Sequence, residues 1–175
     1  MGLLFNTVWF SFGTQAQALE IEGNVKYPVP MGAISSGFAP MIGFGASLYF
    51  NPMFDPEIRN FLSVAYQPYR IKADGTQSSL RLIPILFNIE LPGKVFSDFY
   101  STLGVGAGMT GGYVGATGQT SYGAASSWFT MQIKPGFDWV IGNNVSIVGH
   151  LPVTILIGTV FFSSMDFDLG MKFRI

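Results

Sequence analysis

Side chains in the segment 161–175 alternate between apolar and polar. The even positions carry Asp166, Asp168, Lys172 and Arg174. The odd positions are apolar except for Ser163: Phe161, Met165, Phe167, Leu169, Met171, Phe173 and Ile175. Because successive side chains of a strand point to opposite faces, the pattern predicts a strand with one apolar and one charged face. Such a strand requires lipid on one side and a polar interior on the other, as in a transmembrane β-barrel.

The composition of the whole chain agrees with burial in lipid. Of 175 residues only 11% are charged, against about 25% in soluble domains, and the mean hydropathy is +0.39. The length suits a single domain. The net charge of −1, without a basic run, argues against a nucleic-acid partner. Cysteine is absent, which excludes disulfides and thiolate metal sites.

The N-terminal segment has the pattern of a secretory signal peptide. An apolar run, Leu3 to Phe12, precedes the small-x-small site Ala16-Gln17-Ala18. We therefore predict a signal peptide over residues 1–18 and a mature barrel over 19–175. No Lys or Arg precedes the apolar run, which leaves open a start upstream of Met1. The alternative is a short apolar helix or strand.

Alternation with a period of two recurs in eight segments separated by turn signals. These segments are 19–27, 38–50, 59–72, 79–91, 99–115, 128–141, 145–157 and 161–175. Open strand edges are not tolerated in lipid, so the sequence predicts an all-β fold, a closed eight-stranded antiparallel transmembrane β-barrel. An even count returns both termini to one side, the periplasm. Gly142-Asn143 is then a periplasmic turn, and the short outer loops are 28–37, 73–78, 116–123 and 158–160.

The predicted inward positions hold charges of both signs, which suits a narrow barrel with a salt-bridged interior and no water-filled channel. This predicted interior network comprises Glu20, Glu22, Lys26, Lys134, Asp138, His150, Asp166, Asp168, Lys172 and Arg174. Leu82 and Leu86 are apolar exceptions among the inward positions. Aromatic residues near strand ends, such as Phe99, Phe137 and Trp139, are typical of girdles at the lipid–water interface.

With these features the chain resembles the small eight-stranded outer-membrane barrels of Gram-negative bacteria, the OmpA/OmpX/OmpW-like group. The resemblance covers residues 19–175 and rests on the C-terminal strand, the glycine-alternating run 103–108 and the predicted signal peptide. It implies location in the outer membrane, with outer-membrane lipids and lipopolysaccharide as partners. It also implies that the barrel-assembly machinery reads Phe167, Leu169, Met171, Phe173 and Ile175. The family usually ends in Phe, whereas this chain has Ile175.

His150 is the only histidine and the only candidate for a catalytic base. Members of the resembled family include lipid A acyltransferases and deacylases, but Leu151 and Pro152 follow here where the deacylase motif would place a serine. An interior histidine held by hydrogen bonds is therefore favoured over a lipid A or phospholipid acyl-modifying enzyme. We expect no catalytic residue, no metal site and no cofactor.

Prolines interrupt several of the predicted strands, although proline cannot donate to a strand ladder. Counting from the turns places Pro68 almost opposite Pro84 and Pro135 almost opposite Pro152. Each pair is a predicted lateral gap in the wall; isolated β-bulges are the simpler alternative. Met41, Leu82 and Leu86 are expected to make part of the interior apolar, beside a glycine-lined wall.

Three functions remain open from the sequence. The leading hypothesis is a non-enzymatic barrel that stabilises the envelope or contacts lipopolysaccharide. The short outer loops argue against an adhesin. The alternatives are OmpW-like binding or passage of a small apolar molecule or lipid through the lateral gaps, and a lipid-modifying enzyme.

Overall fold

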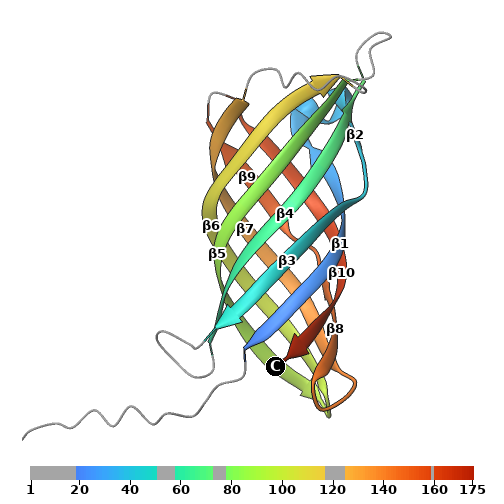
Figure 1. Ribbon diagram of the computed structural model, residues 1–175, viewed down its shortest axis with the longest axis vertical. Helices are drawn as coiled ribbons and strands as arrows, with labels where there is room; N and C mark the ends of the chain where they lie inside the picture. Colours follow the sequence, from blue (N-terminus) through green and yellow to red (C-terminus); the bar gives the residue numbers. More distant parts are fainter. Residues whose placement is uncertain (1–18, 51–57, 73–77, 117–124, 159) are drawn as a thin grey trace, which may run out of the picture.

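The computed structural model describes residues 19–50, 58–72, 78–116, 125–158 and 160–175; the predicted signal peptide lies outside them. Ten strands and one 3₁₀ helix are present in these residues (Figure 1). The strands are β1 (Glu20–Met31), β2 (Phe38–Pro40), β3 (Gly43–Phe50), β4 (Arg59–Ile71), β5 (Ser78–Phe96), β6 (Phe99–Ala116), β7 (Ala125–Val140), β8 (Val145–His150), β9 (Val153–Ile157) and β10 (Phe162–Arg174). The helix, η1, spans Gly32–Gly37.

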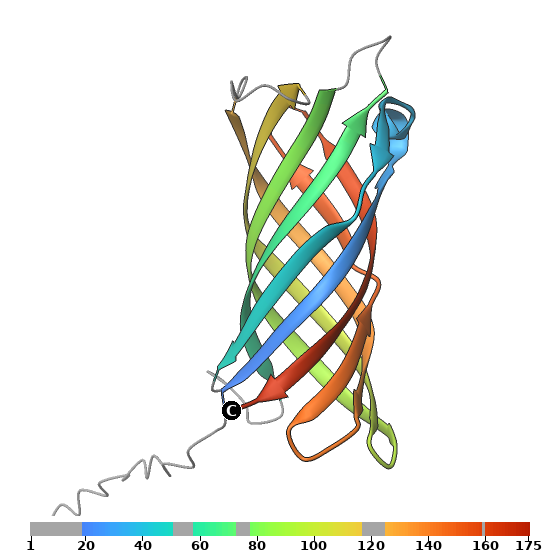
Figure 2. The same cartoon turned by 45° about the vertical axis from the view of Figure 1, so that its right-hand side comes forward.

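The strands form a ring of antiparallel pairs. β1 pairs with β3, and from β3 to β7 each strand pairs with the next one in the chain. β7 pairs with both β8 and β9, these two pair with β10, and β10 pairs with β1. Two residues separate β2 from β3 and two separate β8 from β9, so each of these couples occupies one position in the wall. The ring therefore has eight positions, which confirms the predicted eight-stranded antiparallel barrel. Both views show strongly tilted strands around a cylinder (Figures 1 and 2).

β1 and β5 extend by several residues beyond their predicted C-terminal ends, so the segments 28–31 and 92–96 are strand and not turn. The prolines in these segments lie where the strand has a paired neighbour on one side only, so the missing N–H of proline can face the unpaired side. Pro28 and Pro30 pair with β10 only, because the pairing of β1 with β3 stops at Lys26. Pro92 pairs with β6 only, because β4 begins opposite Glu90.

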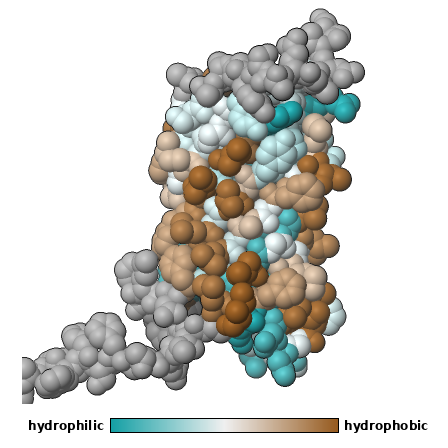
Figure 3. Space-filling model, viewed as in Figure 1, coloured by the Kyte–Doolittle hydropathy of each residue, from teal (hydrophilic) through white to brown (hydrophobic). Residues whose placement is uncertain are grey.

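The alternation that predicted the strands governs which side chains face outward. On β7, Phe129, Met131 and Ile133 are exposed on the outer face, whereas Thr130 and Gln132 are buried inside. The face of the barrel seen in Figure 3 is mostly hydrophobic over the middle and more hydrophilic towards its two ends. No helix in the described ranges is both long and apolar enough to cross a membrane.

The interior at the loop end of the barrel, opposite the C-terminus, holds what we call the apolar cluster. The ring centroids of Tyr69 and Phe162 are 5.2 Å apart, and Phe38 lies 5.8 Å from Phe162. The apolar cluster comprises Tyr69, Leu80, Leu82, Leu156 and Phe162, with Phe38, Ile71 and Trp128 packed against it.

Two of the three residues expected to make the interior apolar face inward. Leu82 is 1% exposed and Leu86 is 2% exposed. The expectation for Met41 is wrong, because this residue is 38% exposed. Met41 falls between β2 and β3, where the regular alternation is interrupted.

Candidate functional site

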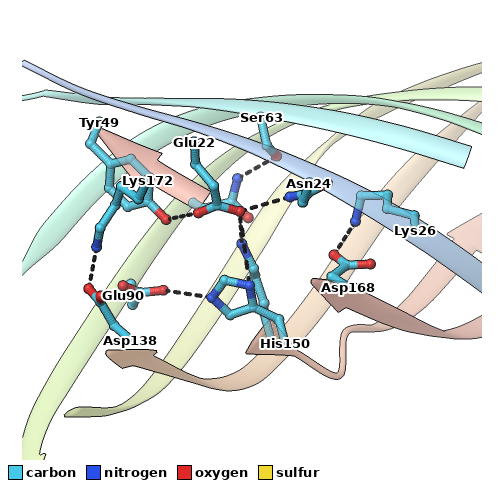
Figure 4. A network of polar contacts seen from close by, with 12 residues as sticks. Glu22, Asn24, Lys26, Tyr49, Ser63, Glu90, Asp138, His150, Asp168 and Lys172 are labelled. Atoms are coloured by element: carbon cyan, nitrogen blue, oxygen red, sulfur yellow. Dashed lines mark hydrogen bonds and ion pairs between the residues drawn. The ribbon is translucent and has the colours of Figure 1, made fainter. Parts of the chain in front are cut away.

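The interior towards the termini holds a second group of side chains, the charged network. Its members come from β1, β4, β5, β7, β8 and β10, where they occupy inward positions of the strands. Figure 4 shows the side chains converging inside the barrel. The charged network comprises Glu20, Glu22, Lys26, Arg59, Glu90, Lys134, Asp138, His150, Asp168, Lys172 and Arg174.

Glu22 on β1 is fully buried and is surrounded by donors. The hydroxyl of Tyr49 donates to Oε2 of Glu22 at 2.6 Å, and Nδ2 of Asn24 donates to Oε1 at 2.7 Å. Nζ of Lys134 lies 3.7 Å from Oε1, and Nδ1 of His150 lies 4.0 Å from the same oxygen. The buried carboxylate thus has hydrogen bonds to both oxygens, which burial of a charge requires.

A second centre forms around Asp138 on β7. Arg59 donates to Oδ2 of Asp138 at 2.8 Å, and Lys172 donates to the same oxygen. Arg59 also lies 3.3 Å from Glu90, and Lys172 lies 3.7 Å from Glu20. The contact between Arg59 and Asp138 joins β4 to β7, which have β5 and β6 between them in the wall, so it crosses the interior and occupies the space of a channel.

Two neighbouring carboxylates on β10 are held differently. Lys26 of β1, which is opposite Asp168 in the register, donates to Asp168. Asp166 accepts hydrogen bonds from Gln67 at 2.5 Å and Ser164 at 3.0 Å. Asp166 is therefore buried without an ion pair among the described residues, between the charged network and the apolar cluster.

The structure brings most of the sequence-predicted network together. Arg174 differs, because its side chain is 55% exposed and lies at the barrel end, where it donates to Glu20 at 2.7 Å. Sequence reasoning missed Arg59 and Glu90. Glu90 is separated from Leu82 and Leu86 on β5 by an even number of residues, so it points to the same face of the strand. This spacing could have predicted that Glu90 faces the interior.

His150 lies between two carboxylates. Its Nε2 is 3.8 Å from Glu90 and its Nδ1 is 4.0 Å from Glu22, distances too long for hydrogen bonds. His150 therefore lies between two buried carboxylates without a hydrogen bond to either of them. Within the described residues, no serine is hydrogen-bonded to His150, and no group of three or more His, Asp or Glu side chains is placed to hold a metal ion.

The wall is interrupted where Pro135 and Pro152 face each other. The register of β7 with β8 ends at Gly136↔His150 and resumes with β9 at Ile133↔Val153, so Pro135 and Pro152 are offset by one residue. Leu151 N donates to Pro135 O at 2.8 Å, and Asp166 N donates to Pro152 O at 2.8 Å. The first bond joins the β8–β9 connection to β7 across the interruption, and the second joins this connection to β10.

The second predicted gap has a different geometry. Pro68 is opposite Arg81, so Pro68 and Pro84 are three residues out of register and do not face each other. The β4–β5 register nevertheless lacks pairs between Val64↔Ile85 and Gln67↔Leu82, next to Pro84. A further break was not predicted from the sequence. It lies on the loop side of the pair Lys26↔Gly43, where β1 has no described pairing with β2.

A groove of about 830 Å³ lies along the wall at the Pro135/Pro152 interruption. Its lining includes the outward side chains Tyr27, Leu151 and Phe167, and also the inward residues Lys26, His150 and Asp168. The groove thus combines residues from both faces of the wall. By contrast, an interior cavity lined by Asn24, Gln132 and Lys134 measures only about 20 Å³, which is room for about one water molecule.

The residues of the predicted assembly signal are all exposed, four of them on β10 and Ile175 directly after it. Phe167, Leu169, Met171, Phe173 and Ile175 are exposed to between 43% and 72%. They form one apolar stripe on the outer wall beside β1. Their reading by the assembly machinery stays a prediction.

The sequence matches no protein-family model and no curated protein. The fold is similar to that of solved outer-membrane barrels. Neisserial surface protein A has a TM-score of 0.66 at 14% identity, with 90% of this chain and 97% of that chain covered. A major outer membrane protein from Thermus thermophilus has a TM-score of 0.64 at 9% identity, covering 91% and 100%. OprG from Pseudomonas aeruginosa has a TM-score of 0.57 at 12% identity, covering 91% and 96%. The chain thus has the fold of the small bacterial outer-membrane β-barrels.

Proposed function

We propose that this protein is a non-enzymatic barrel of the Gram-negative outer membrane that stabilises the envelope as a solid, lipid-embedded body in contact with lipopolysaccharide. The observation that carries the proposal is the filled interior. Glu22, Phe61, Tyr69 and Asp166 are each fully buried, and contacts between opposite strands cross the space that a pore would need. The exposed apolar band on the outer surface requires lipid around it.

Two measurements test this proposal. A folded barrel in detergent should migrate differently on a gel before and after boiling, and identical migration with helical circular dichroism would contradict it. In planar bilayers the protein should give no steady conductance, with a known porin as positive control. Steady openings above background would replace the structural role with that of a pore.

A second candidate, lateral binding of an acyl chain or another apolar molecule, is favoured by the groove that Pro135 and Leu151 line. Burial of an acyl chain contributes about 0.8 kcal/mol per methylene, so a chain seated in the groove would survive gentle purification. Native mass spectrometry should then detect a bound lipid. Leu151→Trp, which fills the groove, should remove it, whereas the control Leu62→Trp on the outer face of β4, away from the groove, should not. A bare polypeptide mass for the wild type eliminates this candidate.

The enzymatic alternative requires His150 as a base. Cells that overproduce the protein should have the same lipid A mass spectrum as cells that produce His150→Ala. A new lipid A species that depends on His150 would establish the enzyme and overturn the non-enzymatic proposal.

A further inference from the structure

Charge at the loop end of the barrel is confined to one hairpin. The segments 28–37, 116–124 and 158–161, which include three of the four loop-end connections, contain no charged residue. The segment 70–81 around the β4–β5 connection contains Arg70, Lys72 and Arg81 and a single acid, Asp74, for a net charge of 3 − 1 = +2. Asp74 lies outside the described residues. The loop end is therefore positively charged on one side only.

Arg70 and Arg81 lie on the outer side of the adjacent strands β4 and β5, and Lys72 directly follows β4. Arg70 and Lys72 are exposed. Arg70 is opposite Ser79 in the register, and Arg81 is opposite Pro68. Arg70 and Arg81 are thus diagonal neighbours on one face, a placement that typically separates side chains by about 7–8 Å. The backbone N–H of Lys72 donates to Gly37 O at 2.9 Å, which fixes the chain where β4 ends.

An aromatic side chain positions one of these cations. Tyr113 on β6 is directly opposite Arg81, and the guanidinium carbon lies 5.7 Å from the centre of its ring. Tyrosine is enriched at the level of lipid headgroups, and a guanidinium stacked on a ring keeps the planar geometry that suits phosphate. Both residues lie near the loop ends of their strands, Arg81 close to the start of β5 and Tyr113 close to the end of β6.

The opposite end of the wall differs in charge. There the exposed Lys94 near the end of β5 is accompanied by the exposed Asp98, so the local charges cancel. The other charges in the described residues belong to the interior or to the barrel end that holds the termini. Arg70, Lys72 and Arg81 are thus the cations that the described residues place on the outer wall at the loop end.

We propose that Arg70, Lys72 and Arg81 form a binding surface for the phosphates of a bisphosphorylated glycolipid headgroup, that of lipid A, in the surrounding leaflet. This inference rests on the proposed function, which places the loop end in the outer leaflet. Charge-assisted bonds from arginine to phosphate oxygens are strong and geometrically specific. A headgroup with two phosphates can contact cations on both strands at once, one phosphate at β4 and the other at β5.

The test is binding of lipid A to the folded protein in neutral detergent, followed by native mass spectrometry. The triple variant R70Q/K72Q/R81Q should bind lipid A on the order of 100-fold more weakly, and R81Q alone about fivefold more weakly, because a basic residue near an anionic surface contributes about 1 kcal/mol. K94Q, which removes a cation from the other end of β5, should bind as the wild type does. The heat-dependent gel shift verifies that every variant is folded.

Three outcomes overturn the inference: a folded triple variant with wild-type affinity, equal binding of dephosphorylated lipid A, or displacement of lipid A by an equal concentration of inorganic phosphate. The last outcome would indicate a site for a free anion. None of the three affects the gel shift or the absence of conductance, so the inference can fail while the proposed function stands.

Discussion

The two halves of the barrel interior are filled in different ways. Towards the termini, ion pairs and hydrogen bonds join opposite strands, as between Arg59 and Asp138. Towards the loops, the rings of Tyr69 and Phe162 pack with Leu82 and Leu156. The first half depends on complementary charges and the second on complementary shapes. Removing one partner leaves an uncompensated charge in the first half but only a cavity in the second.

The largest effect is expected where a buried carboxylate loses its cation. Lys26→Met leaves Asp168 without its ion pair, and we expect a loss of about 3–5 kcal/mol of unfolding free energy. Urea unfolding in lipid vesicles, followed by tryptophan fluorescence, measures this. The control K26M/D168L replaces both charges with apolar groups and should recover most of the loss. If the double variant is as unstable as the single one, charge pairing does not govern this half.

A somewhat smaller effect is expected in the apolar cluster. Leu156 is 1% exposed, and Leu156→Ala should cost about 2–4 kcal/mol because it leaves a cavity. Leu103→Ala on the outer wall, where Leu103 is 51% exposed, removes the same atoms without an enclosed cavity and should cost about 1–2 kcal/mol. The same unfolding assay applies. Equal costs at the two positions would mean that the loop end is not closely packed.

The glycine-rich strand β6 lines one side of the interior and should tolerate added volume poorly. A Cβ at Gly108 would press on the backbone of Ile85 and lie 3.0 Å from Cα of Leu86. We expect Gly108→Ala to cost about 1–3 kcal/mol. Gly111 on the same strand has nothing within 4 Å of an added Cβ, and Gly111→Ala should be neutral or stabilising by up to about 1 kcal/mol. The reverse order in urea unfolding would contradict this packing.

The smallest effect is expected for the exposed ion pair at the barrel end. Arg174→Gln breaks its contact with Glu20 and should cost about 0–1 kcal/mol, because solvent screens an exposed pair. Comparison with Lys26→Met in the same assay separates buried from exposed pairing. A loss well above this range would require Arg174 to be more enclosed than its 55% exposure indicates.

The sequence predicted the barrel wall well because alternation is a local property of each strand. Lys134 and Asp138 could be assigned to the interior from parity alone. The prolines at 135 and 152 could be placed near each other by counting from one tight turn. The relative position of Pro68 and Pro84 could not be predicted in this way, because the connection between their strands is longer and does not define the register. The structure places them three residues out of register.

The partners inside the barrel could not be derived from the sequence in the same way. The pair Lys26–Asp168 follows from the register of adjacent strands, but Arg59 reaches Asp138 across the interior. Such contacts depend on strand tilt and shear, which alternation does not specify. The groove beside Leu151 likewise depends on how side chains from several wall positions meet.

The most direct test of a lipid-embedded barrel with a filled interior uses the absence of cysteine from this chain. Five variants each carry one cysteine, at one of the positions 129 to 133 on β7, and a spin label is attached to it. Collisions of the spin label with oxygen and with a water-soluble nickel complex are then measured in lipid vesicles. We predict high oxygen accessibility at Phe129, Met131 and Ile133, and low accessibility to both reagents at Thr130 and Gln132. Loss of this alternation would contradict the barrel, and access of the nickel complex to Thr130 and Gln132 would contradict the filled interior.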